Sequence, residues 1–204
     1  MLYDLLAECT GKRLPYGSLT GIRPTKLYHE LTESGKDAKN YFKEYLRVPQ
    51  QGADWIERIC DNQKGIYSHN DKQVDFFVNI PICVSRCSYC SFISAELGKI
   101  KKWLAPYVGQ VVREIKHSVA LVENLGVQVR SIYVGGGTPT SLCEKDFEQI
   151  IAELGKIKCK EFTVEAGRPD TISKEKLKIM SDNGVTRISI NPQTFNDKTL
   201  ALIG

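Results

Sequence analysis

Residues 74–90, VDFFVNIPICVSRCSYC, place a predicted strand directly before three cysteines. The run 74–80 is rich in β-branched and aromatic residues and is closed by Pro81, which predicts a β-strand. Cys83, Cys87 and Cys90 follow in the spacing CxxxCxxC. Clustered thiols in a reducing compartment more often bind metal than form disulfides, so the stretch predicts a metal-binding loop at the end of a strand.

After residue 74, short strand-like runs alternate with longer helical ones. The predicted strands are 74–80, 129–134, 162–165 and 187–190, and the predicted helices are 99–125, 144–154 and 174–183. Apolar residues recur at helical intervals in the helices, Ser173 is placed to cap the last one, and Gly126 and Gly184 are placed to stop two of them. Strands that alternate with helices through short connections predict a parallel sheet covered by helices, an α/β fold.

Every conspicuous loop in this part follows one of the predicted strands. The cysteine loop follows the first, GGGTPT at 135–140 follows the second, Glu165 ends the third, and NPQ at 191–193 follows the fourth. Parallel α/β sheets place their chemistry at the carboxyl ends of the strands. Four such loops therefore predict one shared site.

The cysteines indicate iron more than zinc. Their total of seven is odd, which argues against a complete disulfide framework. Structural zinc usually has four ligands, and no second CxxC completes the set, while His69 and His117 each stand alone. Three thiolates in one tight loop suit three corners of a cubane iron–sulfur cluster whose fourth iron is open to another ligand. The other cysteines are isolated and are expected to be buried as small hydrophobic side chains: Cys9, Cys60, Cys143 and Cys159.

The remaining site residues each allow two interpretations. The glycine run matches neither a P-loop nor a dinucleotide-binding loop, so it is either a tight turn or a loop that approaches a ligand closely. Glu165 and Gln193 are either solvated strand-end side chains or acceptors for ligand hydroxyls. Tyr89 could offer its ring and backbone to a purine, and Arg168 could hold a carboxylate in a bidentate pair, as could Arg187.

Composition and charge exclude several classes of protein. With 42% hydrophobic and 25% charged residues, the chain is neither disordered nor fibrous. The net charge is +4 and the basic residues are interspersed with acids, so no nucleic-acid partner is indicated. No signal peptide is evident, and no apolar run approaches the roughly 20 residues that span a bilayer. We expect a cytoplasmic protein without a membrane span.

Residues 1–71 differ from the rest of the chain. Their apolar residues lie in short groups at three-and-four spacing, which predicts short amphipathic helices. The turn at 20–25 leads into one of them, with Pro24 suited to a first helical turn. We therefore expect a helical leader over 1–71 and a separate α/β part over 72–204.

The segments CVSRCSYC at 83–90 and GGGTP at 135–139 resemble those of the radical S-adenosylmethionine (SAM) superfamily, which has CxxxCxxC in the first loop of a βα barrel. Within it, VNIP at 78–81, VEAGRP at 164–169 and QTFN at 193–196 look like the oxygen-independent coproporphyrinogen III oxidase (coproporphyrinogen dehydrogenase) group. LTGIRPTK at 19–26 is similar to the Gram-positive branch of that group. The resemblance covers essentially the whole chain.

The resemblance implies two cofactors, a [4Fe-4S] cluster and SAM, whose reductive cleavage gives a 5′-deoxyadenosyl radical. The implied cluster ligands are Cys83, Cys87 and Cys90. The implied SAM contacts are Gly136, Gly137 and Thr138 for the methionine part, Glu165 and Gln193 for the ribose, and Tyr89 for the adenine. The implied reaction is oxidative decarboxylation of porphyrinogen propionates in haem biosynthesis. The implied partners are a porphyrinogen or other tetrapyrrole and a low-potential electron donor such as flavodoxin or ferredoxin.

Three positions depart from the oxidase pattern. The oxidases have a further cysteine where this chain has Phe92, and a tyrosine and a histidine where it has Phe77 and Asn79. These changes resemble the haem chaperones, which bind cluster and haem without established decarboxylase activity. A chaperone-like function is therefore the alternative.

The number of strands suggests an incomplete barrel. Four are predicted, where a barrel of this superfamily has about six. We expect 72–204 to be the N-terminal part of a truncated radical SAM βα barrel, with an exposed strand edge and an exposed apolar face. A chain of this kind is expected to be poorly soluble or inactive alone.

Overall fold

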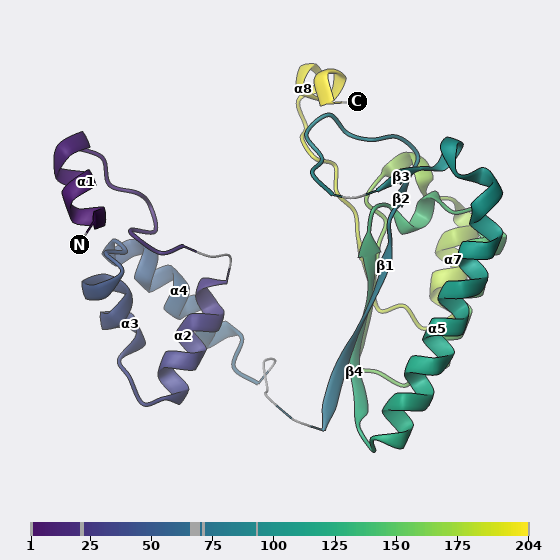
Figure 1. Ribbon diagram of the computed structural model, residues 1–204, viewed down its shortest axis with the longest axis horizontal. Coiled ribbons are helices and arrows are strands. Elements are labelled where there is room, and N and C mark those ends of the chain that lie inside the picture. The colour runs from purple at the N-terminus through teal and green to yellow at the C-terminus, as the bar shows by residue number, and fades with distance from the viewer. Residues whose placement is uncertain (1, 21–22, 66–69, 71, 93, 204) are drawn as a thin grey trace. The chain divides into compact units, whose positions relative to one another are not determined.

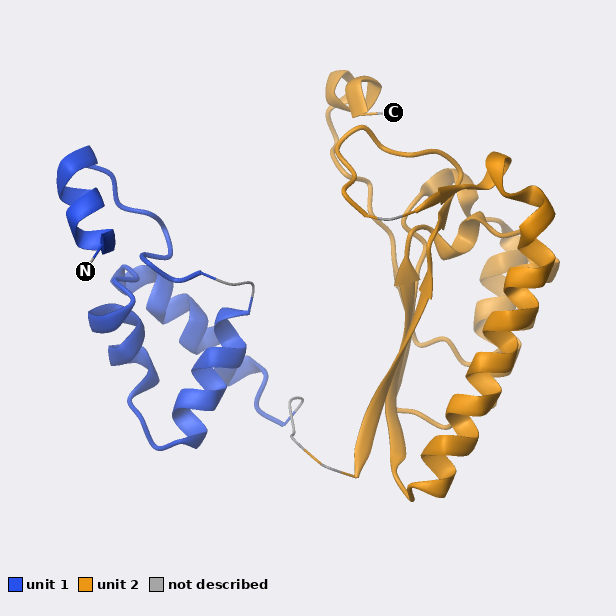
Figure 2. Ribbon diagram, in the orientation of Figure 1, with its two compact units in different colours: residues 1–69 blue, residues 70–204 orange. Residues whose placement is uncertain are grey.

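The computed structural model describes residues 2–20, 23–65, 70, 72–92 and 94–203. Two compact units, residues 1–69 and 70–204, make up the chain (Figure 2). Part of the predicted turn at 20–25 and residue 71, at the predicted boundary, lie outside the described residues.

The first unit is helical in its described part. Its elements are α1 (Leu2–Thr10), α2 (Pro24–Glu33), α3 (Ala38–Asn40), a π-helical segment (Tyr41–Tyr45) and α4 (Gln50–Asn62). Pro24 occupies the start of α2, where its missing N–H has no intrahelical partner to lose. Residues of α2, α3 and α4 pack around the fully buried ring of Phe42, among them Ala53 and Ile56 of α4.

Four parallel strands form the sheet in the described part of the second unit, in the order β1-β4-β5-β6. They are β1 (Gln73–Ile80), β4 (Gln128–Gly136), β5 (Glu161–Glu165) and β6 (Arg187–Ser189). The main helices are α5 (Leu104–Asn124), α6 (Glu144–Leu154) and α7 (Lys174–Asp182), and a last helix, α8, covers Asp197–Ile203. Figure 1 shows α5 and α7 on one side of the strands. The predicted parallel α/β fold is confirmed.

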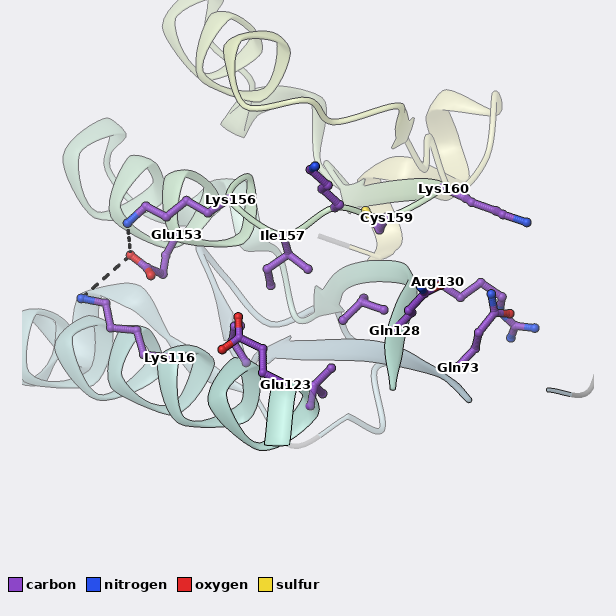
Figure 3. Close-up of a pocket in the computed structure, with 14 residues that line it drawn as sticks. Gln73, Lys116, Glu123, Gln128, Arg130, Glu153, Lys156, Ile157, Cys159 and Lys160 are labelled. Atoms are coloured by element: carbon purple, nitrogen blue, oxygen red, sulfur yellow. Dashed lines mark hydrogen bonds and ion pairs between the residues drawn. The ribbon is translucent and has the colours of Figure 1, made fainter. Parts of the chain in front are cut away.

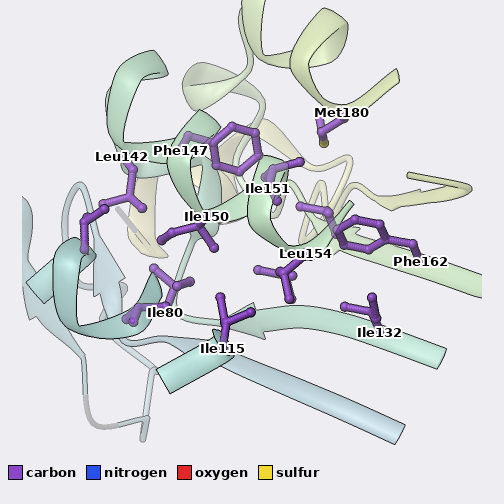
Figure 4. Packing of buried hydrophobic residues seen from close by; sticks show 14 of the residues in the cluster. Ile80, Ile115, Ile132, Leu142, Phe147, Ile150, Ile151, Leu154, Phe162 and Met180 are labelled. Atoms are coloured by element: carbon purple, nitrogen blue, oxygen red, sulfur yellow. The ribbon is translucent and has the colours of Figure 1, made fainter. Parts of the chain in front are cut away.

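The core of the second unit lies between the sheet and its helices. Alternate residues of the strands, such as Ile132 and Phe162, point into it and meet Phe147 and Leu154 of α6 and Met180 of α7 (Figure 4). Phe147, Leu154 and Met180 are essentially inaccessible to solvent. This layer fixes the strands and hence the loops at their carboxyl ends.

The other face of the sheet is open, and it is more polar than expected. Phe77 and Tyr133 are exposed there and their rings lie 6.0 Å apart. Beside them, Ser131 donates to Asp75 at 2.7 Å, and Arg187 pairs with Glu161 at 3.2 Å. The expectation of an exposed apolar face is therefore met only in part, because charged or hydroxyl side chains alternate with the core residues on all four strands.

The strands β1 and β4 pair with one irregularity. Val74 lies opposite Val129, but the next residue, Asp75, lies opposite Ser131, so β4 contains one extra residue, Arg130. Beyond this β-bulge the register is regular and ends with Gly136 opposite Ile80.

Several boundaries differ from the prediction. The helix predicted from residue 99 begins at Leu104, after two 3-10 turns, Leu97–Lys99 and Lys101–Trp103. Pro106 explains this start, because proline is tolerated in the first turn of a helix but not in its interior. A short parallel pair, β2 (Ile82–Cys83) with β3 (Ala95–Glu96), was not predicted, since two residues carry no periodicity.

The isolated cysteines were only partly predicted. Cys60 is buried and Cys159 half-buried, as small apolar side chains would be, but Cys9 and Cys143 are exposed. Cys9 lies in the last turn of α1, and Cys143 is the residue before α6, so both lie at helix ends. No helix in the described ranges is long and apolar enough to cross a membrane.

Candidate functional site

A pocket of about 260 Å³ lies at the carboxyl end of the sheet, where the four conspicuous loops meet. All nine residues predicted to hold a metal or a cofactor line it: Cys83, Cys87, Tyr89, Cys90, Gly136, Gly137, Thr138, Glu165 and Gln193. They come from the ends of four strands that are far apart in sequence. The fold therefore assembles the candidate site, while the role of each residue stays a prediction.

Backbone hydrogen bonds join the glycine loop to the strand that carries the first cysteine. Gly137 N donates to the carbonyl of Ile80 at 2.9 Å, and Thr138 N donates to that of Ile82 at 2.7 Å. The Thr138 hydroxyl lies 3.5 Å from Cys83 Sγ, to which it donates. These bonds hold the loop directly beside the first thiol.

Two glycines are required by this close contact. Gly136 has φ +108°, and a Cβ there would lie 1.9 Å from Asn79 Oδ1. A Cβ on Gly137 would lie 2.7 Å from the carbonyl oxygen of Ile82 and 3.0 Å from Cys83 Sγ. The glycine run is thus a tight turn packed against residues 79–83, and Gly136 and Gly137 also line the pocket.

Cys83 is the last residue of β2, and Cys87 and Cys90 lie in the loop that leads from it to β3. A turn closed by Cys90 N and the carbonyl of Cys87, 3.0 Å apart, separates the last two cysteines. Arg86 donates to the carbonyl of Cys90 at 3.2 Å, and all three cysteines are half-buried. In the described part of the chain, no three His, Cys, Asp or Glu side chains converge as the ligands of one metal ion would. A cubane cluster presents a different iron to each thiolate, so this donor set fits it without such convergence.

Glu165 is held by a tyrosine that sequence reasoning missed. The Tyr133 hydroxyl donates to Glu165 Oε1, and this bond, with burial as a second cause, raises the pKa of Tyr133 to about 12. Tyr133 is the last residue but one of the predicted strand 129–134, and it lies on the face opposite the core residue Ile132. Side chains alternate between the two faces of a strand, so Tyr133 lies on the same face of the sheet as Glu165. This alternation is the sequence signal from which the contact could have been predicted.

Gln193 has a backbone conformation that is rare for its residue type. Its φ is +63°, in the left-handed region that favours glycine, and such a conformation costs about 1–2 kcal/mol. Its side chain lines the pocket together with Asn191, which accepts from Ser189 at 3.2 Å. Strained backbone of this kind is concentrated at functional sites.

The two arginines considered from the sequence differ in position. Arg187 is on β6 and pairs with Glu161, and it is not among the residues that line the pocket. Arg168 does line it, but its guanidinium makes a bidentate pair with Asp170 of the same loop, with both N–O distances 3.0 Å. The carboxylate that Arg168 binds in a bidentate pair is thus supplied by the chain itself.

A larger hollow of about 800 Å³ lies at the opposite, amino end of the strands (Figure 3). It has an apolar wall that includes Ile157, and at its edge Glu153 pairs with Lys156 at 2.7 Å and with Lys116 at 4.0 Å. None of the nine predicted residues lines it. Since parallel sheets bind ligands at the carboxyl ends of their strands, the smaller pocket is the candidate site.

Comparison with known proteins assigns the same region to one family. The model of the radical SAM superfamily matches residues 78–204, from the middle of β1 onward. The oxygen-independent coproporphyrinogen-III oxidase-like protein HemZ of Bacillus subtilis is 35% identical over 98% of this chain and 42% of its own length. The heme chaperone HemW of the same organism is 33% identical over 63% of this chain and 34% of its own length.

A solved structure has the same fold. The coproporphyrinogen III oxidase HemN from Escherichia coli, described as a radical SAM enzyme, superposes with a TM-score of 0.57 at 23% identity. The match covers 70% of this chain and 33% of HemN. The chain therefore spans less than half the length of each of these relatives, and its α/β unit has the fold of part of a radical SAM barrel.

Proposed function

Because this chain belongs to the radical SAM superfamily, and within it to the oxygen-independent coproporphyrinogen III oxidase-like group, we propose that its pocket binds a [4Fe-4S] cluster and SAM. Cys83, Cys87 and Cys90 would hold the cluster. When bound, the cluster supplies the electron that cleaves SAM to a 5′-deoxyadenosyl radical, which removes hydrogen from a substrate. The protein's own residues bind and orient the reactants.

Each wall of the pocket has a distinct part in this proposal. Gly136 and Gly137 line the pocket beside Cys83, so the methionine part of SAM can lie against their backbone. Glu165, fixed by Tyr133, offers an acceptor for ribose hydroxyls, and Gln193, in the loop after β6, lines the same pocket and offers a second. Tyr89 is half-exposed between two cluster cysteines and presents its ring to the adenine.

The reaction we propose for the whole protein is oxidative decarboxylation of porphyrinogen propionates, a step of haem biosynthesis. Support comes from the similarity to HemZ over nearly the whole chain. Our proposal requires a tetrapyrrole substrate at the open face of the sheet. It also requires a low-potential electron donor such as flavodoxin or ferredoxin.

One observation carries the proposal: the three thiols, the glycine wall and two polar acceptors line a single pocket, although they come from the ends of four strands. A metal site alone would not need Glu165 and Gln193 beside the thiols. A nucleotide site alone would not need the thiols.

Anaerobic reconstitution with iron and sulfide tests the cluster, and the assay for 5′-deoxyadenosine tests the chemistry. We expect bound iron with acid-labile sulfide, and release of 5′-deoxyadenosine when reductant and SAM are added. Coproporphyrinogen III should increase that release in the complete protein. Zinc in place of iron, or a reconstituted chain that leaves SAM intact, would refute the proposal.

A second function, transfer of haem without decarboxylation, is favoured by one feature of the site. Phe92, at the position of the oxidases' further cysteine, lines the pocket and is largely exposed. The similarity to HemW, whose name describes a heme chaperone, supports the same alternative. Stoichiometric haem binding that persists without conversion of coproporphyrinogen III would favour the chaperone over the oxidase.

A further inference from the structure

Arg168 connects the loop after β5 to the cysteine loop. Its Nη1 donates to Ser85 Oγ at 2.7 Å, across 83 residues of sequence. Its Nε and Nη2 donate to the two carboxylate oxygens of Asp170, each at 3.0 Å. One guanidinium therefore uses one edge to bind its own loop and another to bind the loop of the thiols.

The chemistry of the guanidinium makes this a directional contact. Its donors lie in a rigid plane, so the bidentate pair with Asp170 fixes the direction in which the remaining N–H points. That pair also raises the pKa of Arg168 and lowers the pKa of Asp170, so both stay charged across the ordinary pH range. The Arg168 side chain is only 26% exposed, which limits competition from water.

The cysteine loop has few other connections of this kind. Ser85 lies between Cys83 and Cys87, in a segment that has no regular secondary structure between β2 and β3. Among the described residues, the hydrogen bonds that join residues 84–90 to other segments are the one from Arg168 and those from Ser88 to the carbonyl of Ile203 in α8. The Ser88 bonds hold the far side of the loop, at 3.2 and 3.5 Å.

We infer that Arg168 is a positioning residue that holds the cysteine loop against the β5 loop through Ser85, and so sets the relative positions of the Cys83 and Cys87 thiols before any cluster binds. Asp170 fixes the guanidinium, and the guanidinium fixes the loop. The inference rests on the proposed function only for what the loop binds. The contact itself belongs to the chain without cofactors.

Hydrogen exchange of the apo chain, followed by mass spectrometry on peptides covering residues 84–92, tests the contact directly. Ser85→Ala and Arg168→Gln should each raise the exchange rate of this segment about three- to tenfold, the effect of losing one hydrogen bond of ordinary net strength, since Ser85 is exposed to water. Ser85→Thr keeps the hydroxyl and should restore the original rate. Arg187→Gln removes an ion-paired arginine that does not line the pocket and serves as the matched control.

The outcomes separate this inference from the proposed function. Exchange in Ser85→Ala and Arg168→Gln that equals exchange in Arg187→Gln would overturn the positioning role, even if the chain binds iron and cleaves SAM. Faster exchange in those two variants, rescued by Ser85→Thr, would support it even in a chain that binds no iron. Circular dichroism of each variant verifies that the fold is retained, and Ser85→Ala is mild enough to keep the test valid if Arg168→Gln unfolds.

Discussion

Replacing Lys176 with methionine would test how the walls of the pocket are supported. Lys176 lies on α7 and is only 7% exposed. Its ammonium donates to the carbonyl of Thr140 at 2.7 Å and to that of Thr171 at 3.1 Å. Thr140 follows the glycine run and Thr171 follows the β5 loop, and their hydroxyls lie 2.6 Å apart. One buried cation thus supports two walls at once.

The loss of stability expected for Lys176→Met follows from these contacts. Lys176→Met keeps a flexible side chain of similar length but leaves both carbonyls buried without their donor. Each loss costs about 1–3 kcal/mol, and the sum is partly offset because an ammonium group no longer has to be desolvated. We expect the free energy of unfolding of the unit 70–204 to fall by about 3 kcal/mol. That is a large share of the roughly 5–15 kcal/mol typical of a domain.

Urea unfolding followed by tryptophan fluorescence can measure this loss in the relevant unit. The chain has two tryptophans, Trp55 in the helical unit and Trp103 in the α/β unit, so a Trp55→Phe background leaves only Trp103 to report. Lys174→Met, an exposed position on the same helix, is the matched control and should change stability by less than about 0.5 kcal/mol. If Lys176→Met unfolds at the same urea concentration as Lys174→Met, the buried ammonium does not support the loops.

Three further perturbations have definite expected results. Gly136→Ala should lower the free energy of unfolding by about 2–3 kcal/mol, since the φ of +108° and the close contacts at this position oppose a side chain. The control Gly126→Ala, where φ is +63° and no atom lies within 4 Å of the added Cβ, should lower it by about 1 kcal/mol in the same urea assay. The pKa of Tyr133 is about 12 in the folded chain against 10.0 for free tyrosine, so the stabilisation from its bond to Glu165 is complete below pH 10 and is lost between pH 10 and 12. Tyr133→Phe should flatten that decline in urea unfolding against pH, and an identical decline in both proteins would contradict the assignment. Serine at Cys83, Cys87 or Cys90 should lower the iron bound after anaerobic reconstitution, whereas Cys143→Ser should bind as much as the parent chain; equal binding by all four would show that the loop is not the metal site.

The elements that could be predicted are those with a clear periodicity of apolar residues and a clear capping or helix-ending residue. The helix over 144–154 and the Ser173 cap of α7 are confirmed, the latter by a bond from Lys176 N to Ser173 Oγ at 3.2 Å. That the candidate residues line one pocket was also predictable, because strand ends in a parallel sheet share one edge. Each of these depends on residues close together in sequence, or on a rule that holds for the whole fold.

The contacts that escaped prediction join residues far apart in sequence. Arg168 meets Ser85 only because the β5 loop and the cysteine loop face each other, and no local pattern marks that pair. Lys176 belongs to a helix rich in lysines, which predicts a solvated side chain, yet it is buried because two carbonyls at loop ends offer it acceptors. Side-chain partners of this type follow from packing, which the sequence pattern does not encode locally.

The β-bulge in β4 has a consequence for how the two ends of the sheet are related. Arg130 is the extra residue, and from Ser131 onward the register with β1 is regular up to Gly136 opposite Ile80. Because side chains alternate between faces, this single offset sets the phase of the whole strand, including which glycine meets the strand that leads to Cys83. A residue gained or lost before Arg130 would leave that phase intact. A residue gained or lost after Ser131 would turn the core side chains of β4 toward the open face and the open-face side chains toward the core. We therefore expect differences in length among related chains to be concentrated before the bulge.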